Sequence, residues 1–266
     1  MQATPLPPGL THLTSDGPIA TITLNHPQKR NALSAPLVAE LIAHLKALEV
    51  AHTRAVILRA APGSPVWSSG HDMDELPVGG RDPLGWTDPL RELVRSIENL
   101  QAPVIAMVAG GVWGGAVEVV LACDLIIATP DATFAMTAAK LGVPYNVSGM
   151  MTFMSAASLR IVKELAFTAA PISATRAEHI GMINHVVPPE SLETFTLEMA
   201  RAIAANAPLS IAVMKEQLRV LAGAKPMSPR GFEKVQGLRR VVYDSRDYHE
   251  GLRAFKEKRK PVFTGA

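Results

Sequence analysis

The amino-acid sequence predicts an α/β fold, with a largely parallel sheet followed by a helical region at the C-terminus. Three short β-branched runs, at residues 54–60, 103–108 and 125–128, alternate with helical patterns and with loops that contain glycine. This alternation indicates βαβ units, whose ligands bind at the carboxyl ends of the strands. After residue 173 only the run 183–187 has the pattern of a strand, and helical patterns dominate.

The first elements are predicted from their apolar periodicity. Residues 18–24 alternate threonine with apolar side chains and indicate a strand, and a polar turn follows at residues 26–31. Ser34 is expected to cap the next helix. The leucines of that helix recur at a period close to 3.6 residues, so one face should lie in the core. They are Leu37, Leu41, Leu45 and Leu48.

Three further helices are predicted near the C-terminus, at residues 209–221, 231–243 and 248–258. Pro226 and Pro229 separate the first two, because proline interrupts helical hydrogen bonding. We therefore divide the chain into a core of residues 1–200, which should carry the functional site, and a helical C-terminal region of residues 201–266.

The composition is that of one compact folded domain. The chain has 266 residues, of which 48% are hydrophobic and 19% are charged, and its formal net charge is +2. So small a charge provides no field that attracts nucleic acid or an anionic membrane, and neither is expected as a partner.

The N-terminus lacks the pattern of a secretory signal and no apolar run has the length of a membrane span, so a cytoplasmic location is expected. The single cysteine, Cys123, lies in an apolar run and should be a buried, unreactive thiol.

Two loops that follow predicted strands contain the candidate functional residues. One loop, at residues 67–73, follows the strand 54–60, and the other, at residues 112–118, follows the strand 103–108 and begins a helix. Each loop can present a backbone N–H, and two such donors that converge on one point form an oxyanion hole. The helix N-terminus at Gly114 would add positive potential there. Ordinary tight turns would produce the same glycine pattern.

Other ligand classes do not fit the sequence. The glycines at positions 110, 111, 114 and 115 match neither G-x-G-x-x-G nor G-x-x-x-x-G-K-[ST], the two common nucleotide-binding motifs. The histidines lack the spacing of a metal site, so no metal ion is expected. Residues 81–89 contain two prolines and are expected to form a surface loop over the first functional loop.

Five motifs, in this order along the chain, resemble those of the crotonase superfamily, also called the enoyl-CoA hydratase/isomerase superfamily. They are Lys29-Arg30-Asn31-Ala32-Leu33, Ser69-Gly70-His71-Asp72-Met73, Trp113-Gly114-Gly115-Ala116-Val117-Glu118, Asp124-Leu125-Ile126-Ile127-Ala128 and Leu141-Gly142-Val143-Pro144. The resemblance implies a spiral of βαβ units, an acyl-CoA substrate, and a C-terminal region that assembles trimers or dimers of trimers. It also implies that the N–H groups of His71 and Gly115 form the oxyanion hole. The His71 imidazole could in addition meet a substrate carboxylate, but the backbone role is favoured.

The hydratases of this superfamily activate water with two glutamates, and the chain matches only one of them. Glu118 occupies the first position and Ala138 occupies the second. Loss of one of two carboxylates that act on the same water should cost orders of magnitude in rate, so hydration is disfavoured. Glu118 could instead complement the dipole of its helix, or repel a substrate carboxylate until CO2 leaves.

Several stretches resemble the branch of the superfamily that decarboxylates methylmalonyl-CoA, at residues 70–77, 79–84, 141–146 and 257–261. Decarboxylation needs no base to start, because departing CO2 itself delivers electrons into an enolate that the two N–H groups stabilise. Tyr145 is a candidate to orient the carboxylate by a hydrogen bond, unless it only fills space after a turn. The competing enzyme is an enoyl-CoA isomerase with Glu118 as its proton shuttle. An RNA-binding member of the fold is disfavoured by the near-neutral charge.

Nine positions are candidates for binding the thioester substrate. They are Arg30, Ser69, Gly70, His71, Asp72, Met73, Gly115, Thr137 and Lys258. The basic run that contains Lys258 would commonly be a solvated tail, but the resemblance implies that Lys258 reaches the CoA phosphates, often from a neighbouring subunit. Arg30 is a second candidate for these phosphates. No cofactor is expected, because coenzyme A is part of the substrate.

Overall fold

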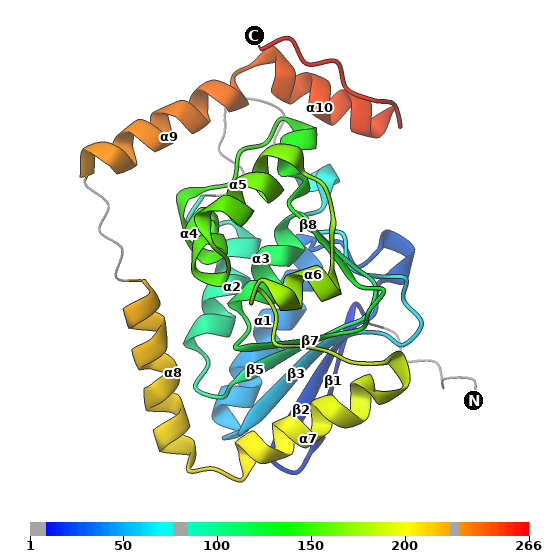
Figure 1. Cartoon of the computed structure of the whole chain (residues 1–266), viewed down its shortest axis with the longest axis vertical. Helices are drawn as coiled ribbons and strands as arrows, with labels where there is room; N and C mark the ends of the chain where they lie inside the picture. The colour runs from blue at the N-terminus through cyan, green and yellow to red at the C-terminus, as the bar shows by residue number, and fades with distance from the viewer. Residues whose placement is uncertain (1–8, 77–84, 224–228, 266) are drawn as a thin grey trace.

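The computed structural model describes residues 9–76, 85–223 and 229–265 (Figure 1). Its larger sheet has six strands in the order β1-β2-β3-β5-β7-β10. β1 (Thr11–Asp16) pairs antiparallel with β2 (Ile19–Leu24), and the other strands run parallel to β2. They are β3 (Ala55–Ala60), β5 (Val104–Val108), β7 (Leu125–Ala128) and β10 (His185–Val186). The predicted α/β fold is confirmed, and every predicted strand is present.

A second sheet has four short strands in the order β4-β6-β8-β9. β4 (Val66–Ser68), β6 (Gly111–Trp113) and β8 (Thr133–Ala135) are parallel, and β9 (Ile172–Ser173) is antiparallel to β8. The two functional loops therefore leave β4 and β6, and the prediction that they directly follow strands of the larger sheet was wrong. Because β4 and β6 are parallel neighbours, their carboxyl ends lie together, and both loops start at the same edge.

Three helices cover one side of the larger sheet: α1 (Ala35–Val50), α2 (Pro89–Asn99) and α3 (Gly115–Ala122). The predicted leucine face of α1 is buried in the main core. Ser34 stands at the N-cap position, as predicted, but its hydroxyl makes no capping hydrogen bond. Instead, the Ala35 N–H donates to both carboxylate oxygens of Glu75, at 2.8 and 3.0 Å. Glu75 ends the short 3-10 helix η2 (Met73–Glu75), so this contact fixes the first functional loop against α1.

The opposite side of the sheet is covered by α7 (Leu192–Ala204), which packs against β3 and β5 in a second apolar cluster (Figure 1). The division predicted between residues 200 and 201 falls inside this helix. Three more helices, α4 (Val147–Ala156), α5 (Leu159–Thr168) and α6 (Ala174–His179), lie between β8 and β10 in the chain. The sequence analysis did not identify these four helices or α2.

The three predicted C-terminal helices are present as α8 (Pro208–Ala222), α9 (Pro229–Tyr243) and α10 (Arg246–Lys256) (Figure 1). α8 has no buried residue and is held to the core by Lys215, whose Nζ donates to Asp124 Oδ2 at 2.8 Å. α10 instead packs on the 3-10 helix η3 (Thr137–Leu141), which borders the functional loops. Among the residues that the structure describes, no helix is both long and apolar enough to cross a membrane.

Candidate active site

The functional loops after β4 and β6 meet backbone against backbone at Gly70. This glycine has φ +88°, in the left-handed region that glycine tolerates best. A Cβ atom on it would lie 2.5 Å from the Trp113 carbonyl oxygen and 2.8 Å from the Gly115 nitrogen. No side chain fits in that space. The close approach explains why the first loop requires glycine here.

The N–H groups of His71 and Gly115 lie on the two sides of this contact. A Cβ at Gly115 would be 3.6 Å from the His71 nitrogen, so the two donors are neighbours. Within the described residues, neither N–H donates a hydrogen bond to the protein. Gly115 is also the first residue of α3, where the helix dipole is positive. Two unpaired donors at a helix N-terminus suit an oxygen that gains negative charge.

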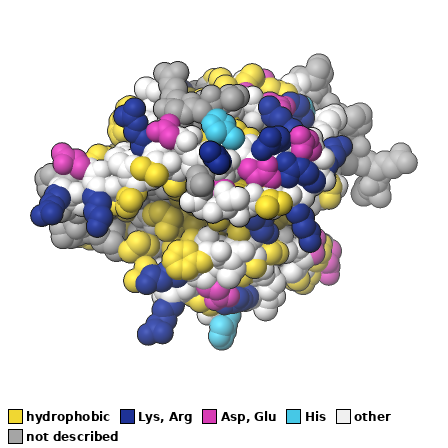
Figure 2. Space-filling model, turned by 90° about the horizontal axis from the view of Figure 1, so that it is seen from above, with side chains coloured by type: hydrophobic (Ala, Val, Ile, Leu, Met, Phe, Trp, Pro, Cys, Tyr) yellow, Lys and Arg dark blue, Asp and Glu magenta, His cyan; other side chains and the backbone are white. Residues whose placement is uncertain are grey.

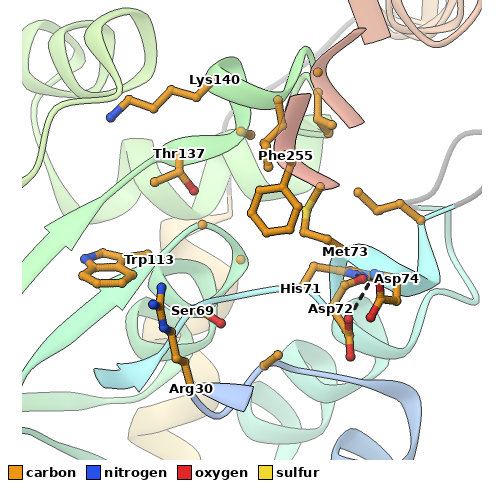
Figure 3. A pocket seen from close by; sticks show the side chains of 18 of the residues that line it. Arg30, Ser69, His71, Asp72, Met73, Asp74, Trp113, Thr137, Lys140 and Phe255 are labelled. Atoms are coloured by element: carbon orange, nitrogen blue, oxygen red, sulfur yellow. Dashed lines mark hydrogen bonds between the residues drawn. The ribbon is translucent and has the colours of Figure 1, made fainter. Parts of the chain in front are cut away.

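These loops line a cavity of about 610 Å³ (Figure 3). Its wall contains most of the predicted site residues: Arg30, Ser69, His71, Asp72, Met73, Gly115, Glu118, Thr137 and Tyr145. Gly70 lies behind the wall and shapes it through its contact with the second loop. Figure 3 shows that Thr137 and Lys140 come from η3, across the cavity from Ser69 and Arg30. The volume is that of a site for a small-molecule group.

Tyr145 reaches the cavity from the turn before α4 and packs edge-on against Phe153, with ring centroids 5.2 Å apart. Its hydroxyl is buried and forms no hydrogen bond of standard geometry among the described residues. Burial raises the pKa of Tyr145 and the negative charge of Glu118 raises it further, whereas a contact with the Ala138 backbone lowers it, so the net shift is upward and the phenol stays protonated. A buried hydroxyl without a partner is unfavourable unless a ligand supplies one. Tyr145 is therefore suited to donate a hydrogen bond to a bound molecule.

Glu118 lies one turn into α3, where its side chain is almost completely buried. It is paired with Arg91 of α2, which is also buried. Burial raises the pKa of Glu118 to about 7, although the charge of Arg91 acts in the opposite direction. Gly149 of α4 leaves room for the carboxylate, because a Cβ there would lie 3.0 Å from Glu118 Oε2. The carboxylate thus lies between α2 and α4 and is already bound to a cation.

The His71 ring makes two hydrogen bonds to oxygen atoms. Nδ1 is 3.0 Å from the Asp72 carbonyl oxygen, and Nε2 is 3.2 Å from Asp88 Oδ2. Asp88 caps α2 with its other oxygen, Oδ1, which accepts from the N–H groups of Leu90 and Arg91. Burial lowers the pKa of His71, but the hydrogen bonds and the charges of Asp88 and Glu75 outweigh it, so the net shift is upward.

The cavity is closed on its far side by α10 and the turn after it. Phe255, Arg259 and Pro261 belong to its wall, and Arg259 is bound to Glu250 and Glu257. Lys258 is exposed and is not in the wall, and its contact with the CoA phosphates stays a prediction. Basic and acidic side chains are mixed on the surface above α10 (Figure 2).

Two charged residues beside the site, Asp88 and Arg91, were not predicted from the sequence. Residues 85–88 of the loop predicted at 81–89 form neither helix nor strand. Residues 77–84 lie outside the described part of the chain, but Pro89 is the first residue of α2. The signal was present, because an aspartate before proline marks a helix start. Cys123 is buried, and burial raises the pKa of its thiol, as expected of an unreactive cysteine. No group of three metal-binding side chains occurs in the described ranges.

Comparison with known proteins agrees with this architecture. The family described as enoyl-CoA hydratase/isomerase matches residues 14–266. The chain therefore belongs to the enoyl-CoA hydratase/isomerase family, and the predicted resemblance is confirmed. Membership of this family leads us to expect a CoA thioester as the substrate. The cavity is a candidate site for the acyl group of that thioester.

Individual relatives within the family are more specific. Methylmalonyl-CoA decarboxylase of Escherichia coli is 53% identical over 247 residues, which cover 93% of this chain and 95% of the relative. Carnitinyl-CoA dehydratase of Salmonella arizonae is 34% identical over 261 residues, or 95% and 97% of the two chains. Among solved structures, methylmalonyl-CoA decarboxylase in complex with 2-nitronate-propionyl-CoA matches with a TM-score of 0.95 and 50% identity, over 97% of this chain and 99% of that one.

Proposed function

We propose that this protein decarboxylates methylmalonyl-CoA, or the closely related malonyl-CoA, through a thioester enolate. The similarity to methylmalonyl-CoA decarboxylase over nearly the whole chain supports this substrate. The observation that carries the proposal is the buried hydroxyl of Tyr145, which forms no hydrogen bond of standard geometry among the described residues, in the same cavity as the two unpaired N–H groups. The Tyr145 hydroxyl suits a carboxylate, and the two N–H groups suit a developing oxyanion.

In the proposed reaction, the bond between the α-carbon and the carboxylate carbon breaks, and CO2 leaves. The electron pair of that bond moves towards the thioester carbonyl, whose oxygen becomes the enolate oxygen. The N–H groups of His71 and Gly115 donate to this oxygen. A proton then adds to the α-carbon and gives propionyl-CoA. The stabilisation is greatest when the charge is on the oxygen, so it lowers the barrier and not only the energy of the bound substrate.

Orientation of the carboxylate is the second requirement. The breaking bond must stand perpendicular to the thioester plane, so that its electrons enter the π system. The Tyr145 hydroxyl is proposed to hold the carboxylate in that position by donating a hydrogen bond. Glu118 also lines the cavity, and its charge would repel a substrate carboxylate until CO2 departs.

Neither a metal ion nor a bound cofactor takes part in this proposal, because the electrons come from the bond that breaks. Coenzyme A enters as part of the substrate. A cytoplasmic location, without a nucleic-acid or membrane partner, remains the expectation from the sequence.

Self-association as a trimer or a dimer of trimers is also proposed, with residues 201–266 as the assembling region. The exposed apolar side chains of α8 support it, because a helix that displays many of them commonly contacts another chain. These side chains are Leu209, Val213, Met214, Leu218, Val220 and Leu221. Sedimentation velocity of the purified protein would determine the number of subunits.

The alternative function is that of an enoyl-CoA isomerase, in which Glu118 would move a proton between carbon atoms. A pKa of about 7 would suit such a proton shuttle, but the ion pair with Arg91 occupies the carboxylate and argues against this role. Hydration is further disfavoured by the apolar side chain of Ala138 in the cavity wall. Of the three reactions, decarboxylation, isomerisation and hydration, decarboxylation is therefore the best supported.

Incubation of the purified protein with a set of acyl-CoA thioesters tests the proposal directly. In buffer that contains EDTA, methylmalonyl-CoA should be converted to propionyl-CoA, whereas a 2-enoyl-CoA and a 3-enoyl-CoA should react slowly or not at all. Mass spectrometry of the thioesters distinguishes loss of CO2 from addition of water. Activity that disappears with EDTA and returns with one divalent ion would overturn the metal-free reaction.

Lys258 provides a test of how coenzyme A is held. Replacing it by alanine should raise KM for CoA thioesters about three- to ten-fold while kcat changes less, because phosphate contacts stabilise the bound substrate and the transition state alike. The effect should shrink at high salt, which screens exposed charges. Lys256→Ala is the matched control for loss of one charge from the same basic run. A normal KM in Lys258→Ala at low salt would make Lys258 a solvated side chain.

A further inference from the structure

The His71 ring has an unusual surrounding for a histidine, because both of its nitrogens face acceptors. The Asp72 carbonyl oxygen has no proton to give to Nδ1, and an ionised Asp88 carboxylate has none to give to Nε2. A neutral imidazole carries only one N–H and satisfies one of these contacts. An imidazolium carries two and satisfies both.

The two members of the His71–Asp88 pair are not equivalent with respect to the cavity. His71 belongs to the cavity wall, whereas Asp88 does not, so the histidine is the member of the pair nearer to the substrate space. The Asp88 carboxylate is bound to the first N–H groups of α2, where the helix dipole offsets part of its negative charge. The cavity therefore faces the positive member of the pair. The side chain of His71 is 15% exposed and that of Asp88 is 7% exposed, which limits screening by water.

We propose that Asp88 holds the His71 ring as an imidazolium, and that this positive charge stabilises the enolate oxygen bound at the backbone N–H of the same residue. This proposal rests on the decarboxylation proposed above. Asp88 is then a positioning residue, because it acts on the reaction only through His71. A fixed charge next to a developing oxyanion stabilises the transition state more than the bound substrate.

Other charged groups near the His71 ring also favour the imidazolium, or have their charge offset by a neighbouring group. Glu75, at the end of η2, adds a second negative charge that favours the imidazolium. The Asp72 carboxylate is 3.6 Å from Lys29, which offsets its charge. Arg30 and Glu118 line the cavity with opposite charges, and Glu118 is bound to Arg91. Among the described residues, Asp88 is therefore the main group that favours protonation of His71, against the opposing effect of burial.

The test uses Asp88→Asn, which preserves the fold, because asparagine caps a helix about as well as aspartate. Nitrogen-15 spectra of histidine-labelled protein report the ring of each histidine, and His71→Gln identifies the His71 signal. In the wild type the His71 ring should remain an imidazolium at neutral pH, and in Asp88→Asn it should lose its proton at a lower pH. Glu92→Gln is the matched control, because it removes an exposed charge from the same helical turn.

Kinetics then test the effect on the reaction. At about pH 8, Asp88→Asn should lower kcat for methylmalonyl-CoA by about ten-fold with little change in KM, and at about pH 6 the loss should be smaller, because a larger fraction of the rings is protonated. Glu92→Gln should follow the wild-type pH profile. An unshifted His71 titration, a loss of kcat that is equal at both pH values, or a change confined to KM would each overturn the proposal. If the wild type releases no CO2, the proposed function fails, while the spectra still test the imidazolium.

Discussion

Replacing Tyr145 by phenylalanine is expected to lower kcat for decarboxylation of methylmalonyl-CoA by about 10- to 1000-fold, or roughly 1.4 to 4 kcal/mol of barrier. The substitution removes the hydroxyl that is proposed to orient the carboxylate and leaves the ring in its packing against Phe153. KM should change little, because the CoA part of the substrate is bound elsewhere. Steady-state kinetics on the purified variant measure both constants.

The same variant should nearly retain its free energy of unfolding, since the hydroxyl that it loses forms no hydrogen bond of standard geometry in the described structure. A fall in activity without a fall in stability separates a role in the reaction from a structural role. Glu118→Gln provides the contrast. If isomerisation were the true reaction, turnover of a 3-enoyl-CoA would be lost in Glu118→Gln and kept in Tyr145→Phe. Tyr145→Phe with wild-type decarboxylation would remove Tyr145 from the mechanism.

Gly70→Ala is expected to lower kcat by about 100- to 1000-fold, because it disrupts the oxyanion hole without changing either residue that donates to it. The new Cβ would lie 2.5 Å from the Trp113 carbonyl oxygen and 2.8 Å from the Gly115 nitrogen. Both are backbone atoms, so the two loops must separate to accommodate it. The N–H groups of His71 and Gly115 would then no longer converge on one oxygen.

Gly63→Ala is the matched control for this variant. Gly63 has φ +80°, close to the +88° of Gly70, but a Cβ there would meet no atom within 4 Å. Both substitutions place alanine in the left-handed region, which costs roughly 1 kcal/mol. Thermal unfolding should therefore show some loss of stability in each, whereas kcat should fall only in Gly70→Ala. Equal kcat values in the two variants would show that the close contact at Gly70 does not matter for catalysis.

β3, β5 and β7 of the larger sheet could be predicted because each is a mostly buried apolar run, such as Val104–Val108. β1 gives no such signal, since it is an edge strand whose second half is polar and exposed. β4, β6 and β8 have only three residues each, and their pairing depends on contacts between distant parts of the chain. A short strand of this kind has no periodicity of its own, so the second sheet could not be predicted from local patterns.

The candidate site was predicted mainly through glycine and motif position. The pairing of the loops at Gly70 and Gly115 follows from the family resemblance, and the structure provides the physical reason, which is their backbone contact. The partners of the charged site residues were not predictable in the same way. Arg91 and Glu118 are 27 residues apart in the sequence, and no local pattern links them. Only the packing of α2 on α3 brings them together.

Decarboxylation in deuterium oxide tests most directly the central claim, which is that loss of CO2 itself forms the enolate. Propionyl-CoA should appear with one deuterium on its α-carbon, because solvent supplies the proton that replaces CO2. The remaining methylmalonyl-CoA should gain deuterium no faster than in a reaction without enzyme, since no base removes its α-proton. Enzyme-dependent exchange into methylmalonyl-CoA, without release of CO2, would contradict the account and indicate proton-transfer chemistry at Glu118 instead.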